Sequence, residues 1–395
     1  MKKKKDGFIV TVYAITKNEA KFVDKWFNSM KNADHIVVMD TGSTDDTVEK
    51  FKELASLYDN IKIYEKKIVP WHFGNARQAC LELCPKDTDI FVSTDLDEYF
   101  EQENWVEILK SKWDKKYERG IYKYSWSHND DGSSARVFRY DKIHNKDWVW
   151  KYPVHELMIS KKRKDNSYPS DVCCYLFDDI HLHHFPDKNK SRSSYLPLLE
   201  QRAKEDPNDY YGLIYLAHER SYRKKYNEAI DTFRDILKRF NDRMSSVERA
   251  SCYLFMGDNY TEMGKLTEDE NKKKDNFTMA EASYFQSYLS DPTYREGYIG
   301  LGKLYVIMKE YDKAIFYVTE GLKHGVRHYT WLERDHSWSY EPYDVLSLAY
   351  FYSGRKALSL SYAVKAASYD NNNERLKNNI KLILDNTPDE DYIPK

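Results

Sequence analysis

Residues 89–98, DIFVSTDLDE, pass from a short apolar run to a group of carboxylates. The run Ile90, Phe91 and Val92 is typical of a buried strand. Asp95 and Asp97 follow its end, and two carboxylates one residue apart can both face a divalent cation. Hard oxygen ligands suit Mg²⁺ or Mn²⁺, and phosphate oxygens commonly complete the coordination shell. The alternative interpretation is a solvated acidic pair that closes a strand.

The chain before this stretch alternates short apolar runs with amphipathic segments. Strands are predicted at residues 8–15, 35–39 and 61–64, and helices at residues 19–31, 48–57 and 74–83. Such alternation with short joins predicts a mainly parallel sheet covered by helices. Ligands on sheets of this kind bind beyond the carboxyl ends of the strands.

Polar segments stand at the expected strand ends along this half of the chain. They are Lys17-Asn18-Glu19, Asp40–Thr47, Trp71–Arg77 and Asp95–Glu98. In the second, Gly42 makes a turn, and Ser43 or Thr44 can cap the helix that follows. An acidic pair, an arginine and a helix N-terminus along one edge are what a nucleoside diphosphate with a metal ion requires.

After a further helix at residues 105–116, extended segments predominate. Strands or extended segments are expected at residues 120–127, 135–140, 148–159 and 171–184, with the basic run 161–164 in a turn between the last two. Alternation along the last strand places His181 and His183 on one face and His184 on the opposite face.

From about residue 191 the strand signal vanishes, and the chain is helical to near its end. Asp206-Pro207 and Asp291-Pro292 lie 85 residues apart, as do Tyr226-Asn227-Glu228-Ala229-Ile230 and Tyr311-Asp312-Lys313-Ala314-Ile315. Each Asp-Pro is expected to open a helix and each Tyr-x-x-Ala-Ile to begin its partner, a pattern that resembles tetratricopeptide repeats. Residues 247–263 and 278–289 then form a divergent repeat with an insertion at 265–276, and residues 342–353 and 355–369 form a last pair. An unspecific helical bundle is the alternative.

The composition excludes several classes of protein. The 62 Lys+Arg and 64 Asp+Glu give a net charge of −2, which excludes nucleic-acid binding by a bulk positive field. No apolar run approaches the ~20 residues that a transmembrane helix requires, and no secretory signal follows the basic N-terminus. Five cysteines without metal-finger spacing favour a reducing cytoplasm. We therefore expect a cytoplasmic protein with no transmembrane segment and no nucleic-acid partner.

The order of the motifs resembles that of a known enzyme family. KNE at residues 17–19, DTGSTD at 40–45, W-x-F-x-x-A-R at 71–77 and D-x-D-E at 95–98 look like those of GT-A glycosyltransferases of the family-two type. The resemblance covers roughly residues 7–240. Within the family, the motif order is similar to that of a bacterial subgroup, which includes lipooligosaccharide-core and peptide S-glycosyltransferases. Many members of this subgroup carry tetratricopeptide-like helices. The resemblance implies a GT-A, Rossmann-like α/β catalytic domain at residues 1–190 and an all-α tetratricopeptide-like domain at 191–395.

The resemblance also implies roles for the motif residues. Lys17, Asn18 and Glu19 belong to the nucleotide-binding set, and Asp40 resembles the carboxylate that binds the uracil edge. Arg77 resembles the cation near the nucleotide, Asp95 the carboxylate close to the ribose, and Asp97 the direct ligand of Mn²⁺ or Mg²⁺. In two departures from the family pattern, Lys17 stands where many members stack an aromatic ring on the base, and Gln78 follows the motif arginine in place of asparagine.

Two segments later in the first domain extend the resemblance. Residues 148–156 resemble the subgroup's V-H-E segment, and Glu156 is the expected general base that takes the acceptor proton. Alternatively, Glu156 orients His155 or an arginine. Residues 179–186 resemble the stretch where GT-A enzymes often place a third metal contact, for which His183 is favoured, with His184 and His181 behind it.

Three tryptophans offer a further sugar contact, because an aromatic face stacks on a pyranose ring. Trp126, Trp148 and Trp150 either line a sugar or acceptor cleft or belong to the core.

The expected activity is metal-dependent, inverting transfer of a sugar from a nucleoside diphosphate sugar, most closely a UDP-sugar. A glycan, a lipid-linked sugar and a peptide are all compatible acceptors, and the helical half would bind the acceptor or a partner protein, or self-associate. The alternative is a non-catalytic repeat scaffold with a degenerate nucleotide-binding domain. The intact Asp40, Arg77, Asp95, Asp97 and His155-Glu156 argue against such decay. A nucleotidyltransferase would show a Gly-rich phosphate loop after the first strand, where this chain has Thr16-Lys17-Asn18-Glu19.

Overall fold

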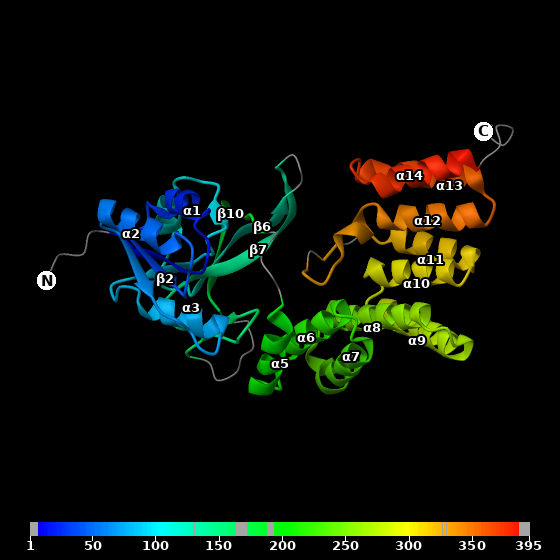
Figure 1. The fold of residues 1–395 in the computed structure, drawn as a ribbon, viewed down its shortest axis with the longest axis horizontal. Coiled ribbons are helices and arrows are strands. Elements are labelled where there is room, and N and C mark those ends of the chain that lie inside the picture. Colours follow the sequence, from blue (N-terminus) through cyan, green and yellow to red (C-terminus); the bar gives the residue numbers. More distant parts are fainter. Residues whose placement is uncertain are drawn as a thin grey trace. The chain divides into compact units, whose positions relative to one another are not determined.

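The computed structural model describes residues 7–128, 132–162, 172–187, 193–325, 327–328 and 330–386. The chain forms two compact units, Met1–Asp209 and Tyr210–Lys395 (Figure 1). The basic run Lys2–Lys5, residues 163–164 of the second basic run and Asp171 lie outside the described residues.

The first unit combines strands with helices. Its elements are β1 (Val10–Thr16), α1 (Val23–Met30), β2 (His35–Asp40), α2 (Thr47–Leu57), β3 (Ile61–Glu65), α3 (Phe73–Glu82), β4 (Ile90–Ser93), β5 (Glu98–Phe100), α4 (Trp105–Lys112), β6 (Arg119–His128), β7 (Ser134–His144), β8 (Trp148–Lys151), β9 (Leu157–Ser160), β10 (Cys174–His184) and α5 (Tyr195–Glu205). Because α5 lies in this unit, the compact units divide at 209/210, a little beyond the domain boundary expected at 190/191.

Within the described residues, eight strands form one sheet in the order β3-β2-β1-β4-β7-β6-β10-β5. β1 pairs in parallel with β2 and β4, β2 with β3, and β6 with β10. β7 runs antiparallel to β4 and β6, and β5 runs antiparallel to β10. Six of the eight strands therefore share one direction, and the prediction of a mainly parallel sheet with flanking helices is confirmed.

The extended segment expected at residues 148–159 is not a single strand. Residues 148–159 form a separate hairpin of β8 and β9, joined by a turn. Tyr152 and His155 in that turn adopt positive φ angles of 77° and 46°, which interrupt an extended chain. The short strand β5 was not predicted.

The central strand β1 explains why helices cover both faces of the sheet. All seven of its residues are buried. Val12 and Ala14 pack in the cluster that contains Trp26 of α1, whereas Tyr13 packs in the cluster that contains Cys80 of α3. Because side chains alternate along a strand, an uninterrupted apolar run serves two cores at once.

The strand register aligns the carboxyl ends of the parallel strands. Thr16 pairs with Asp40, Asp40 with Glu65, and Tyr13 with Ser93. The loops that follow β1, β2 and β4 therefore leave the sheet at the same edge, as parallel pairing requires.

All the regular secondary structure in the described part of the second unit is helical. Its elements are α6 (Tyr210–Tyr222), α7 (Tyr226–Phe240), η1 (Asn241–Arg243), α8 (Ser246–Leu266), α9 (Glu270–Ser290), α10 (Arg295–Ile307), α11 (Tyr311–Lys323), η2 (Asp335–Trp338), α12 (Glu341–Tyr352), α13 (Lys356–Tyr369) and α14 (Glu374–Asp385).

Consecutive helices pack as hairpins: α6 with α7, α8 with α9, α10 with α11, and α12 with α13. α7 and α11 begin at Tyr226 and Tyr311, in agreement with the 85-residue repeat. The expected insertion at residues 265–276 is not a loop, because these residues complete α8 and begin α9. Both helices reach 21 residues as a result.

Tyrosine fills gaps that glycine leaves between the helices. Tyr284 of α9 is 2% exposed, and a Cβ at Gly257 of α8 or Gly300 of α10 would lie 2.6 Å from its ring. Its hydroxyl donates to Asp258 Oδ1 at 2.8 Å. Among the described helices of both units, none has the length and apolar character needed to cross a membrane.

Candidate functional site

Asp95 and Asp97 lie in the tight connection between β4 and β5, on either side of Leu96. Leu96 is fully buried in the core. Glu98 closes the connection: its Oε2 accepts the Asp95 N–H at 2.8 Å, and its own N–H donates to the Asp95 carbonyl at 3.1 Å. The backbone that carries the two carboxylates is thereby fixed.

Arg77 reaches this connection from α3. Its Nη2 donates to Asp95 Oδ1 at 2.7 Å, and its Nε donates to Glu156 Oε1 at 2.6 Å. The side chain is 6% exposed. Its Nη1 is buried and has no hydrogen-bond partner among the described residues. One guanidinium therefore joins the acidic motif after β4 to the V-H-E segment.

The start of α3 docks on the turn that holds Glu156. The N–H groups of Phe73 and Gly74 donate to the carbonyls of Pro153 and Tyr152, both at 3.0 Å. A Cβ at Gly74 would lie 2.6 Å from the Tyr152 carbonyl oxygen, so this approach requires glycine. The W-x-F-x-x-A-R motif thus places its arginine by bringing the start of its helix onto the β8–β9 turn.

Arg202 of α5 supports the same turn and was not selected from the sequence. It is fully buried, and its Nη1 donates to the carbonyls of Val154 at 3.0 Å and His155 at 2.6 Å. Its guanidinium lies 4.0 Å from the ring centroid of Tyr152. Its partners lie nearly fifty residues earlier in the chain, so no local pattern signals the contact.

A second buried cation, Lys142 of β7, was also missed. Its Nζ lies 3.2 Å from Asp95 Oδ2 and 3.4 Å from Glu98 Oε1, and the side chain is 7% exposed. This strand was expected to end at Tyr140, whereas β7 continues to His144. Had the strand been predicted to its full length, a lysine within it would have been the signal for a buried ion pair.

The two cations set the protonation of the carboxylates around them. Burial alone would raise the pKa of Asp95, but the charges of Arg77 and Lys142 outweigh it and hold that pKa well below its usual range. Burial is likewise outweighed at Glu156, whose pKa Arg77 lowers. Burial raises the pKa of Glu98 in spite of Lys142. Two fixed cations thus face two ionised carboxylates and a third that takes up a proton more readily.

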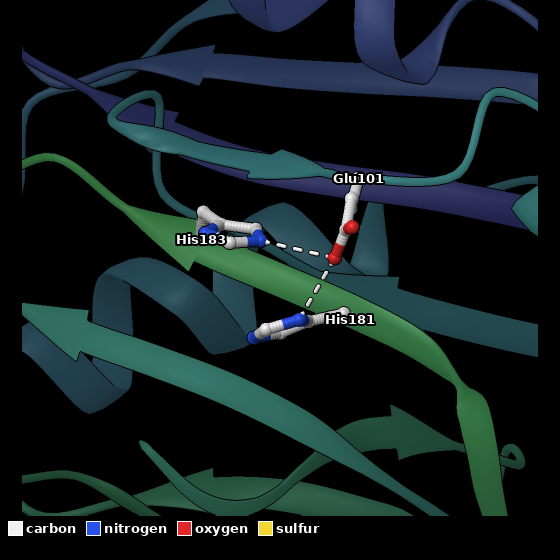
Figure 2. A group of neighbouring side chains, drawn as sticks. All are labelled: Glu101, His181 and His183. Atoms are coloured by element: carbon white, nitrogen blue, oxygen red, sulfur yellow. Dashed lines mark hydrogen bonds and ion pairs between the residues drawn. The ribbon is translucent and has the colours of Figure 1, made fainter. Parts of the chain in front are cut away.

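The histidines of β10 divide between two carboxylates. His184 Nε2 lies 3.5 Å from Asp97 Oδ2. His181 Nδ1 and His183 Nε2 both meet Glu101 Oε2, at 2.9 and 3.3 Å (Figure 2). The expected alternation of faces along β10 is therefore found. As a result, His184 meets Asp97 of the D-x-D motif, whereas His183 meets Glu101.

The loops after β1 and β2 hold each other. Asn18 adopts a positive φ of 56°; its Oδ1 accepts the Thr44 N–H at 2.7 Å, and its N–H donates to Ser43 Oγ at 2.8 Å. The Glu19 N–H donates to Thr47 Oγ1 at 2.8 Å. Asn18 thus connects the KNE and DTGSTD motifs, and Glu19 connects KNE to the start of α2.

Asp40 is buried, and its carboxylate caps its own loop. Oδ2 accepts the N–H groups of Gly42 at 2.8 Å and Ser43 at 3.0 Å, and Oδ1 accepts the Ser43 hydroxyl. Any contact of this carboxylate with a base would compete with these bonds. Lys17 is exposed in the neighbouring loop.

The three candidate tryptophans differ in burial. Trp148 and Trp150 are 1% and 7% exposed and belong to the core. Trp126 is 46% exposed, and its ring centroid lies 4.8 Å from that of His184. Trp126 alone of the three presents an aromatic face beside the Asp97–His184 pair.

A hollow of about 460 Å³ lies next to the same connection. Its lining residues are Lys21, Phe22, Lys25, Tyr99, Phe185, Pro186 and Asp187. The Phe185 N–H donates to the Asp97 carbonyl at 2.8 Å, which fixes this wall to the motif. The lining combines aromatic rings with two lysines.

Comparison with known proteins finds a family match within the first unit. The family model "Glycosyl transferase family 2" matches residues 11–181. A 111-residue stretch is 33% identical to Hsp70-Hsp90 organizing protein 3 of Arabidopsis thaliana, and it covers 28% of this chain and 17% of that protein.

Solved structures resemble this chain over about half of its length. TTC0263, a thermophilic TPR protein in Thermus thermophilus, is 21% identical with a TM-score of 0.40, over 48% of this chain and 88% of that one. MamA is 19% identical with a TM-score of 0.32, over 46% of this chain and 83% of that one. Residues 11–181 thus match a glycosyl transferase family 2 domain, and helices that pack in pairs follow it.

Proposed function

We propose that the chain transfers a sugar from a nucleoside diphosphate sugar, a UDP-sugar by resemblance, to a glycan, lipid-linked or peptide acceptor, with inversion and with a divalent metal ion. The observation that carries the proposal is the cluster of Arg77, Asp95 and Lys142 beyond the carboxyl end of β4, within a family 2 domain. Open α/β sheets bind their ligands at this edge.

The charge balance of the cluster supports an anionic donor. Asp95 is matched by two cations, and Glu156 is paired with one of them. The carboxylates are therefore neutralised by the protein and do not repel a diphosphate. The Nη1 of Arg77 remains as a donor without a partner among the described residues.

The donor set at Asp97 fits a divalent cation. Asp97 offers a carboxylate oxygen, and His184 offers Nε2 at 3.5 Å from it, while His184 Nδ1 faces the Trp126 carbonyl at 3.2 Å. A hydrogen bond at the other ring nitrogen is the usual way a ligating histidine is oriented. This geometry favours His184 over His183 as the partner of Asp97. A bound Mn²⁺ or Mg²⁺ would act as a Lewis acid on the diphosphate leaving group.

The contacts of Glu156 support a positioning role more than the base role that the resemblance implies. A general base works best with a pKa near the working pH, and Arg77 lowers the pKa of Glu156. A carboxylate that holds Arg77 at 2.6 Å fixes the guanidinium beside Asp95. We therefore propose that Glu156 acts mainly by orienting Arg77, which is the alternative that the sequence left open.

The acceptor would be bound by exposed aromatic surface and by the helical unit. Trp126 offers a ring face for a sugar beside His184. The hairpins of the second unit are the kind of repeat that binds peptides or partner proteins. We propose catalysis in the first unit, Met1–Asp209, and acceptor or partner binding in the second, Tyr210–Lys395.

The proposal is tested by donor hydrolysis without an acceptor. The full chain is incubated with Mn²⁺ and a panel of nucleotide sugars, and release of nucleoside diphosphate is measured. We expect slow hydrolysis of one donor, which Asp97→Ala abolishes and Asp87→Ala, a change at an exposed carboxylate, preserves. If no donor is bound or hydrolysed, the scaffold alternative holds, and if Asp97→Ala remains active, the metal assignment is wrong.

A further inference from the structure

A second group of potential metal ligands lies on β10, apart from the Asp97–His184 pair. Glu101 stands just after β5, and His181 and His183 lie two residues apart on β10, with both rings turned to the same carboxylate (Figure 2). Two imidazoles and one carboxylate, each offering one atom, converge within 4.8 Å. The proposed transferase chemistry makes no use of them.

The two separations from the glutamate oxygen are close to those in a metal coordination shell. Glu101 Oε2 lies 2.9 Å from His181 Nδ1 and 3.3 Å from His183 Nε2. Ligands at 2.0–2.2 Å from a tetrahedral zinc ion lie about 3.3 Å from one another. Small movements of an exposed glutamate would suffice to admit the ion.

The other ring nitrogens of both histidines are already oriented. His181 Nε2 lies 2.7 Å from Ser125 Oγ, which in turn lies 2.6 Å from Ser134 Oγ. His183 Nδ1 lies 2.9 Å from His128 Nε2. Metal-ligating histidines are usually oriented by a hydrogen bond at the second ring nitrogen. Here that nitrogen must be the donor, Nε2 in His181 and Nδ1 in His183, for the other ring nitrogen to bind the ion. These outer contacts distinguish the cluster from a chance gathering of polar side chains.

We infer that Glu101, His181 and His183 bind Zn²⁺ or a chemically similar transition-metal ion, with a solvent molecule in the fourth position. Imidazole nitrogens suit such ions better than Mg²⁺ or Ca²⁺. The side chain of Glu101 is 56% exposed, which leaves an entry path. The inference does not depend on the proposed glycosyl transfer.

The metal site would cross-link the edge of the sheet next to the β4–β5 connection, which carries Asp95 and Asp97. β5 is a three-residue edge strand, held to β10 through Glu98, Tyr99 and Phe100. A metal bound by Glu101 and two residues of β10 would cross-link the end of β5 to β10. Because Asp97 immediately precedes β5 and His184 ends β10, the cross-link would hold both in register.

The test is zinc binding to the untagged, metal-free full chain carrying Asp97→Asn, which removes the carboxylate of the other pair. We expect one Zn²⁺ per chain in competition with a chromogenic chelator. Glu101→Ala and His183→Ala should each weaken binding by roughly tenfold or more. Glu101 is exposed, so its removal is compatible with folding, and His35→Ala serves as the control histidine.

Two further readouts separate a built site from nonspecific binding. Bound Co²⁺ should give the intense visible absorption of a four-coordinate ion, and Zn²⁺ should raise the melting temperature; both effects should be absent in Glu101→Ala. The inference is overturned if Zn²⁺ does not bind, if Glu101→Ala and His183→Ala bind it as well as the parent, or if zinc binding requires an intact Asp97.

Discussion

Replacement of Lys142 by methionine tests whether buried charge holds the motif connection in place. Methionine keeps an unbranched side chain of similar length and removes the ammonium group. That group now lies 3.2 Å from Asp95 and 3.4 Å from Glu98 in a side chain that is 7% exposed. Its removal leaves Asp95 with Arg77 and leaves Glu98 with the Tyr124 hydroxyl, which donates to it at 2.8 Å.

We expect the free energy of unfolding of the first unit to fall by about 3 kcal/mol at pH 7. Breaking a buried ion pair by removal of one partner costs about 3–5 kcal/mol. The lower end applies because Arg77 still pairs with Asp95 and because Glu98, whose pKa burial already raises, can take up a proton.

The sign of the pH dependence follows from Glu98. Without Lys142 its pKa in the folded state rises further above the unfolded value of about 4.3. A carboxyl with a raised folded pKa contributes stability below the unfolded pKa and loses it as pH rises to the folded pKa. The destabilisation of Lys142→Met should therefore be smallest near pH 4 and grow toward neutral pH.

Denaturant unfolding followed by tryptophan fluorescence measures this loss, because seven of the nine tryptophans precede residue 200. Lys110→Met is the matched control, since Lys110 pairs with Asp34 at 2.7 Å with both side chains about one-third exposed. An exposed pair contributes about 0–1 kcal/mol. Equal losses in the two variants, or a loss at Lys142 that does not change with pH, would refute the reasoning.

Three further changes probe separate parts of the chain. Trp126→Ala should raise the KM for a sugar substrate by roughly tenfold, the value of one aromatic contact, without unfolding the protein. Steady-state kinetics measure this change. An effect on kcat alone would show that the ring does not bind sugar. Glu156→Gln should weaken nucleotide binding, measured by calorimetry, and lower donor hydrolysis and sugar transfer together. If only transfer falls, by about 10²–10⁴-fold, Glu156 is instead the general base. Gly300→Ala should lower the free energy of unfolding of the helical unit by about 1–3 kcal/mol through overpacking against Tyr284, as followed by circular dichroism. Gly325→Ala, where an added Cβ meets nothing within 4 Å, should leave it unchanged.

The sequence predicts most of the fold because its signals are local. The apolar run of β1 and the Tyr-x-x-Ala-Ile starts of α7 and α11 each lie within a few residues of the structure they specify. The β8–β9 hairpin escaped prediction because its turn depends on positive φ angles at Tyr152 and His155, which are uncommon outside glycine. Contacts from α3 and Arg202 hold that turn.

The candidate site is less predictable because its partners are distant in sequence. Arg77 and Asp95 could be selected from motifs, but Lys142 lies 47 residues after Asp95, on a strand whose extent was underestimated. Selection of His183 over His184 rested on resemblance. The choice between neighbours on a strand depends on which face meets Asp97, which requires the register of β10 against β5.

The two motif carboxylates, one residue apart, have different surroundings and so suit different tasks. Arg77 and Lys142 engage both oxygens of Asp95, and Asp95 thereby fixes the connection between α3, β4 and β7. Asp97 meets the imidazole of His184 and is 7% exposed. A carboxylate already matched by two cations has little affinity left for a third, whereas Asp97 meets a single imidazole and is the better candidate ligand for a metal ion. The D-x-D spacing separates the two because the intervening Leu96 is fixed in the core, and we propose that Asp95 organises the site while Asp97 binds the metal ion.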